Sequence, residues 1–172
     1  RNYRNLKILG ILGPITAFDG MFIASALGLI ALDAMVIYQS AILLIVLLIA
    51  LIGGRIIPAF TRNWLQRERP DATMPVMFTR FDGVCLAALA ITIVIGMVDT
   101  DGVIFGAALL ITATLHGLRM VRWRGHLTLR DPLVAMLHFA YFWVPAGLAA
   151  FGIAHIWPDV IAARDALHGL TG

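Results

Sequence analysis

Cysteine is almost absent from this sequence. The only one, Cys85, lies in an apolar stretch, so the chain can form no internal disulfide and no zinc site built from cysteines. We expect Cys85 to be a small apolar packing residue. The sequence also contains no phosphate-binding loop, no dinucleotide-binding fingerprint and no nucleophile elbow. The Gly-rich pairs that it does contain are therefore interpreted as helix-packing features.

Charged residues are scarce as well. They make up 13% of the chain, whereas 60% of the residues are hydrophobic and the mean hydropathy is +0.90. Soluble domains carry roughly 25% charged and 45–50% apolar residues. A soluble chain of this length could not bury so much apolar surface in one core. Apolar runs recur along the whole sequence, so a signal peptide does not explain them. The composition predicts an all-α, polytopic transmembrane helix bundle with the lipid bilayer as its partner.

A helix that spans the bilayer needs about 20 mostly apolar residues. By this measure residues 1–172 form a single transmembrane region with about six spans. The first residue is Arg1 rather than Met, and the last lies within an apolar pattern, so we expect the chain to belong to a longer protein. The expected spans cover about residues 6–30, 35–57, 81–98, 103–121, 132–154 and 157–172, the last of them truncated.

Basic residues gather on one side of this arrangement. Twelve of the thirteen Lys and Arg residues fall in the N-terminal arm, in residues 55–80 and in residues 119–130. By the positive-inside rule this side, and with it the N-terminus, is cytoplasmic. The formal net charge of +3 is thus a topology signal and does not indicate nucleic acid. Trp64 and Trp123 are expected as interface anchors on the basic side, and Trp143 is expected to pack inside the bundle.

Asp19 and Arg55 are singled out among the charged residues inside expected spans, where ionisable groups are costly. Asp19 could be a proton or cation site or the partner of a buried base; equally, the span could be shifted or the carboxyl neutral and hydrogen-bonded. Arg55 follows Gly53 and Gly54, which allow close approach to the backbone, and precedes Pro58, which favours a kink. Its guanidinium could grip a carboxylate through two parallel bonds, or it could extend to the lipid headgroups.

Three of the five histidines also lie inside expected spans: His116, His138 and His168. Imidazole suits iron, copper and zinc. A lone membrane histidine is more often a hydrogen-bonded packing residue, but three of them make a metal or heme site a serious alternative. The remaining two, His126 and His155, are placed in the cytoplasmic loop and at the outer end of a span. No spacing typical of a known metal motif decides between these interpretations.

One stretch is more specific than the rest. Residues 53–65, with the sequence GGRIIPAFTRNWL, closely resemble the hallmark of the NnrS family of bacterial inner-membrane proteins. Residues 118–145 and 166–172 look similar to two further stretches of that family. Typical members have about twelve spans, so the resemblance implies that this chain is about half of one, with the remaining half of the same protein as a partner.

The resemblance also implies cofactors and a role. Members of the family are described as binding heme and copper and as easing nitrosative stress, with nitric oxide as the implied ligand. The implied ligands here are His138 and His168, followed by His116. Arg55 would be a heme-propionate or structural anchor, in a site shaped by the adjacent motif residues Gly53, Gly54 and Pro58.

Two rival functions remain open at this stage. The first is a transporter or channel subunit with a polar intramembrane path around Asp19 and Arg55. The second is a metal-free structural or sensory membrane protein. The sequence assigns no catalysed reaction.

Overall fold

In the computed structural model, residues 6–31, 33–99, 102–160, 162 and 165–168 are described, and all regular structure in them is helical. The expected all-α membrane bundle is thereby confirmed. The helices are α1 (Leu6–Ala26), α2 (Ala34–Glu68), α3 (Arg80–Val98), α4 (Val103–Val121) and α5 (Pro132–Ile156), with a short 3₁₀ helix η2 (Gly125–Thr128) between the last two.

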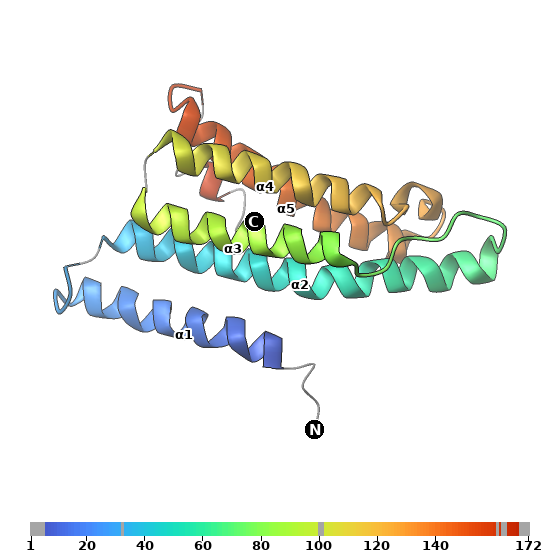
Figure 1. Ribbon diagram of the computed structural model, residues 1–172, viewed down its shortest axis with the longest axis horizontal. Helices are drawn as coiled ribbons and strands as arrows, with labels where there is room; N and C mark the ends of the chain where they lie inside the picture. The colour runs from blue at the N-terminus through green and yellow to red at the C-terminus, as the bar shows by residue number, and fades with distance from the viewer. Residues whose placement is uncertain (1–5, 32, 100–101, 161, 163–164, 169–172) are drawn as a thin grey trace.

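The helices lie along the long axis of the molecule (Figure 1). Helix α2 is central, since it packs against α1, α3 and α5, while α3 also packs against α4. Helix α1 lies at one edge and packs against α2. One end of the bundle collects the C-terminal ends of α2 and α4 and the N-terminal ends of α3 and α5 (Figure 1). This is the end that the basic residues predict to be cytoplasmic.

The described helices account for most, but not all, of the six expected spans. Four described helices, α2 to α5, are long and apolar enough to cross a membrane, and α1 adds a shorter apolar helix over Leu12–Ala26. In the sixth expected span, Trp157 is the C-cap of α5, and residues 165–168 are helical. The rest of that span lies largely outside the described residues.

The first helix ends earlier than predicted because of a glycine. Gly28 adopts a left-handed backbone with φ of 70°, and its N–H donates to the Ser25 carbonyl oxygen. The N–H of Leu29 donates to the carbonyl oxygen of Ala24. This pair of bonds is a Schellman motif, which closes a helix at glycine at little steric cost. Helix α1 therefore stops at Ala26, whereas the apolar pattern predicted a span to residue 30.

The second helix, in contrast, continues well past the predicted end. Its last turns run to Glu68, with Pro58 inside the helix. The side chains of Ile57, Thr61 and Leu65 are all buried. Their spacing of four residues continues one face of the helix onto the bundle. This packing holds the helix together beyond the proline, so α2 extends eleven residues past residue 57, where the predicted span ended.

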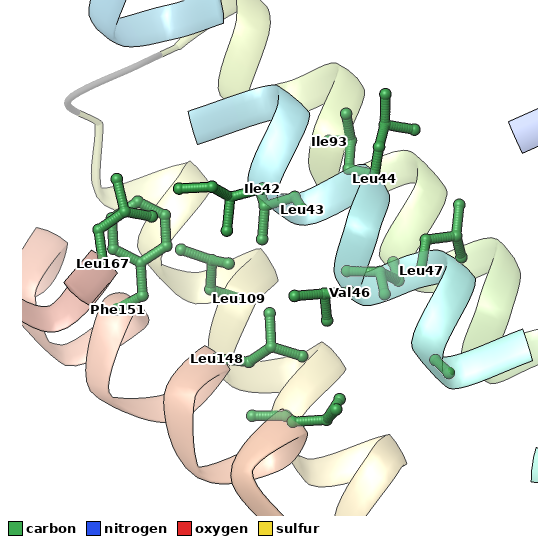
Figure 2. Close-up of a cluster of buried hydrophobic side chains, with 14 of the residues drawn as sticks. Ile42, Leu43, Leu44, Val46, Leu47, Ile93, Leu109, Leu148, Phe151 and Leu167 are labelled. Carbon is green, nitrogen blue, oxygen red and sulfur yellow. The ribbon is translucent and has the colours of Figure 1, made fainter. Parts of the chain in front are cut away.

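The hydrophobic core joins the four helices α2, α3, α4 and α5 (Figure 2). Leu43, Leu109 and Leu148 come from three different helices and are at most 1% exposed. Between helices in a bilayer, close van der Waals packing replaces the hydrophobic effect as the main attraction. Helices α4 and α5 approach most closely at two glycines: a Cβ on Gly106 would lie 3.0 Å from the carbonyl oxygen of Gly152.

Candidate functional site

An arginine without solvent contact lies at the centre of the candidate site. Arg119, near the C-terminal end of α4, is 0% exposed, and its Nε donates to Asp82 Oδ1 of α3 at 2.7 Å. Its Nη1 donates to the Ala50 carbonyl oxygen of α2 at 2.9 Å and to the Tyr141 hydroxyl of α5 at 3.3 Å. The guanidinium thus ties four helices together. Arg119 was predicted as one of the basic residues of the cytoplasmic side, at the end of the span over residues 103–121; its complete burial was not predicted.

The predicted glycine pair makes room for this arrangement. A Cβ on Gly54 would overlap the guanidinium of Arg119, and one on Gly53 would lie 3.0 Å from the Tyr141 ring. The Arg119 Nη2 atom beside Gly54 is buried and has no hydrogen-bond partner. The glycines therefore allow two side chains from other helices to approach the α2 backbone, as their lack of a Cβ permits.

The Tyr141 hydroxyl connects the ion pair to a histidine. It lies 2.9 Å from His116 Nδ1, and His116 is 0% exposed. The other ring nitrogen, Nε2, is buried and has no hydrogen-bond partner among the described residues. A histidine with one nitrogen held by a neighbour and the other unused is the arrangement that metal-binding histidines show.

A second histidine is held by a threonine. Thr61 Oγ1 of α2 donates to the Ile57 carbonyl oxygen at 2.9 Å and lies 2.8 Å from His138 Nε2 of α5. A hydroxyl has one hydrogen, which the bond to Ile57 uses, so His138 is the donor through Nε2–H. The lone pair of the His138 ring is then on Nδ1.

His138 Nδ1 lies beside an apolar cavity of about 430 Å³. A Cβ on Gly125 would be 2.5 Å from Nδ1, so only the missing Cβ lets this nitrogen lie against the Gly125 backbone, and both residues line the cavity. Besides His138, the cavity is lined by a second imidazole, His126, and by mostly apolar side chains: Met120, Val121, Leu129, Ala135, Phe139 and Phe142, with Gly125. His126 was predicted to lie in the cytoplasmic loop. The short helix η2 within that loop places it at the same cavity as His138.

Trp123 packs between the two histidine sites. It is 1% exposed, its ring centroid is 4.6 Å from that of Tyr141 and 6.3 Å from that of His138, and Arg119 lies over its face. Trp143 is 65% exposed. The two tryptophan predictions are therefore both wrong: Trp123 packs inside and Trp143 faces outward. Helix spacing alone does not reveal which face of α5 meets the bundle.

The other predicted site residues lie apart from this network. Arg55 is half-buried, with its guanidinium 5.5 Å from the ring centroid of Phe78. His168 lines a cavity of about 410 Å³ with Tyr38 near the start of α2. Tyr38 and Thr61 are 23 residues apart on one helix, which corresponds to about 35 Å. His168 thus lies at the opposite end of the bundle from His138.

Asp19 is exposed on α1, and no described contact joins it to Arg55. Among the described residues, no group of three or more His, Cys, Asp and Glu side chains could hold a metal ion. Any metal bound by the residues described above would have one or two imidazole ligands from this part of the chain.

Asp82 and Thr61, which hold Arg119 and His138, were not predicted as site residues. Both lie near a predicted span end, where polar residues are ordinarily exposed. For Thr61 one signal was present in the sequence, since it lies inside the family-like stretch of residues 53–65, and for Asp82 there was none.

Comparison with known proteins agrees with the motif evidence. The profile of a family described as NnrS protein matches residues 1–172. No curated protein and no solved structure matches the chain. Because the family profile extends over all 172 residues, the chain belongs to the NnrS family.

Proposed function

We propose that this membrane protein binds heme or copper through His138 and His116 inside its helix bundle, and that it acts in the response to nitric oxide or in relief of nitrosative stress. One observation carries the proposal: Thr61 holds His138 Nε2, which leaves the Nδ1 lone pair beside an apolar cavity. Family membership supports the choice of heme and copper.

The residues present fit such a group. The cavity of about 430 Å³ is within the range of roughly 300–1,000 Å³ typical of small-molecule sites. His126 supplies a second imidazole to the same cavity, and imidazole nitrogen is a common ligand of both iron and copper. The lining is mostly apolar, and apolar surroundings lower the local dielectric and influence the redox potential of a bound metal.

His116 is the second candidate ligand. Its Nε2 is buried without a hydrogen-bond partner, while Tyr141 holds Nδ1. With Nε2 engaged by a metal, Nδ1 would keep its hydrogen and donate to the Tyr141 oxygen. Arg119 and Asp82 hold Tyr141 in place, so three buried residues would determine the orientation of this imidazole.

Heme iron or copper, when bound, would supply nitric oxide ligation and redox chemistry. The protein contributes the imidazole orientation and the exclusion of water. Arg55, beside Phe78, does not line this cavity, so its predicted role as a propionate anchor stays separate from the His138 site. The prediction for His168 stays separate, because that residue lines another cavity.

The test is an absorption spectrum and metal analysis of the full chain purified from membranes in detergent. We expect bound heme or copper, with His138→Ala lowering its content at least tenfold. His155→Ala is the matched control, because it removes an imidazole from the same helix. His155 Nδ1 is hydrogen-bonded to the carbonyl oxygen of Phe151, four residues earlier in α5. A colourless, metal-free intact protein overturns the proposal, and wild-type metal content in His138→Ala overturns the assignment of His138.

A further inference from the structure

We propose that a groove between α2 and the first turn of α5 binds an anionic phospholipid of the cytoplasmic leaflet. The groove consists of two cavities of about 730 and 420 Å³. They adjoin because both are lined by Trp64, Asp131 and Leu133. The proposal concerns the bilayer and is independent of any metal.

The deeper part of the groove is apolar and open. Ile56 and Phe60 on α2 are 42% and 54% exposed, and Leu137 of α5 faces them across the larger cavity. From Ile56 to Trp64 the lining follows one face of α2 for eight residues, or about 12 Å. One leaflet contributes about 15 Å to a hydrocarbon core of about 30 Å. The apolar part of the groove can therefore hold most of one acyl chain.

The other end of the groove is polar, and its acidic groups are already occupied. Glu68 pairs with Arg67 at 2.9 Å, and the Asp131 carboxylate accepts the backbone N–H groups of Leu133 and Val134 as the N-cap of α5. The remaining charged groups of the groove are two arginines.

Arg69 and Arg130 come from the ends of two different helices and line the smaller cavity together. Neither has an acidic partner among the described residues. Two unpaired guanidinium groups favour a phosphate, which they can bind through paired hydrogen bonds. Basic pockets between helices on the cytoplasmic side are typical places for anionic headgroups. Trp64, between the apolar and basic parts, suits the interfacial depth.

Native mass spectrometry of the full chain tests the headgroup preference. We expect phosphatidylglycerol to be retained over phosphatidylcholine, and R69Q/R130Q to weaken its retention by about 30-fold. Each basic residue near an anionic surface contributes about 1 kcal/mol to binding, so the loss of two corresponds to this factor. The control R62Q/R80Q removes the same charge from exposed arginines at the same end that do not line the groove. Equal losses in the two double variants, or equal retention of both lipids by the wild type, overturn the proposal.

A photo-crosslinking amino acid at Phe60, in the full chain in native membranes, identifies the occupant of the apolar part. An adduct with the mass of an anionic phospholipid supports the proposal. An adduct with a polypeptide, whether another segment or a second copy, overturns it, as does an adduct with zwitterionic lipid alone. The same probe at Ile91, which is 60% exposed on α3 and outside the groove, reports the composition of the surrounding bilayer for comparison.

Discussion

Arg119 and Asp82 form an ion pair at 2.7 Å in which the two side chains are 0% and 4% exposed. A charge at this depth is costly to hold unless it is paired and hydrogen-bonded. Asp82 is fixed at the start of α3, where its Oδ2 accepts hydrogen bonds from the backbone N–H and the hydroxyl of Thr79. The pair therefore couples the beginning of one helix to the end of another.

Asp82→Asn is expected to destabilise the protein strongly, because it leaves the Arg119 charge buried and uncompensated. Removing one partner of a buried pair typically costs about 3–5 kcal/mol. Denaturant unfolding in detergent micelles measures the loss. Glu68→Gln, which breaks the exposed pair with Arg67, is the control and should cost at most about 1 kcal/mol. Similar losses in both variants would contradict a special role for the buried pair.

Gly54→Ala is expected to destabilise α2 even though alanine is the better helix former. The added Cβ would overlap the Arg119 guanidinium, and overpacking of this kind typically costs about 1–3 kcal/mol. Gly117→Ala in α4 is the control, since a Cβ there meets nothing within 4 Å. Helix propensity should make that change neutral or stabilising by up to about 1 kcal/mol. Thermal unfolding of both variants decides between the packing effect and propensity.

Tyr141→Phe removes the hydroxyl between Arg119 and His116 while keeping the ring against Trp123. We expect a loss of stability of about 1–3 kcal/mol, because the buried Arg119 Nη1 and His116 Nδ1 both lose the hydroxyl as a hydrogen-bond partner. If His116 binds the metal, its affinity should also fall, by about 10- to 100-fold. Tyr38→Phe, at an exposed position, serves as the control in both measurements. Unchanged metal affinity together with lower stability would assign Tyr141 a purely structural role.

Thr61→Val tests the orientation of His138, since it keeps the shape of the side chain and removes the hydroxyl. We expect heme or copper affinity to fall by about 10- to 100-fold, as when other partners of metal-binding histidines are removed. Competitive metal titration or heme transfer to an acceptor protein measures this. Thr114→Val is closely matched, because Thr114 makes the same bond to the carbonyl oxygen four residues earlier but is exposed. Equal affinities in the two variants would exclude a role for the Thr61 hydroxyl.

Sidedness is checked by labelling single-cysteine variants in a Cys85→Ser background. We expect Arg67→Cys and Arg130→Cys to react from the cytoplasmic side and Asp159→Cys from the opposite side, because the two arginines line grooves at one end of the bundle. Labelling of Arg67→Cys and Arg130→Cys from opposite sides would contradict the positive-inside assignment and the placement of the lipid groove.

The sequence was sufficient for the class of protein, most helix positions and the family. Long apolar runs leave few alternatives to membrane helices, and residues 53–65 predicted the family whose profile matches residues 1–172. Helix ends were less predictable. Gly28 closed α1 through backbone bonds that hydropathy does not register, and the packing of Thr61 and Leu65 carried α2 past Pro58.

Chain composition and spacing determined by themselves that this protein lies in a bilayer and that its basic loops share one side. Only the tertiary structure decided which charged side chains are buried. Arg119 and Arg122 look equivalent as neighbours in a basic stretch, yet the first is fully buried and the second is half-buried over Phe81. The difference arises because Asp82, Tyr141 and Gly54 reach the same point from three other helices, and sequence distance carries no information about such a meeting.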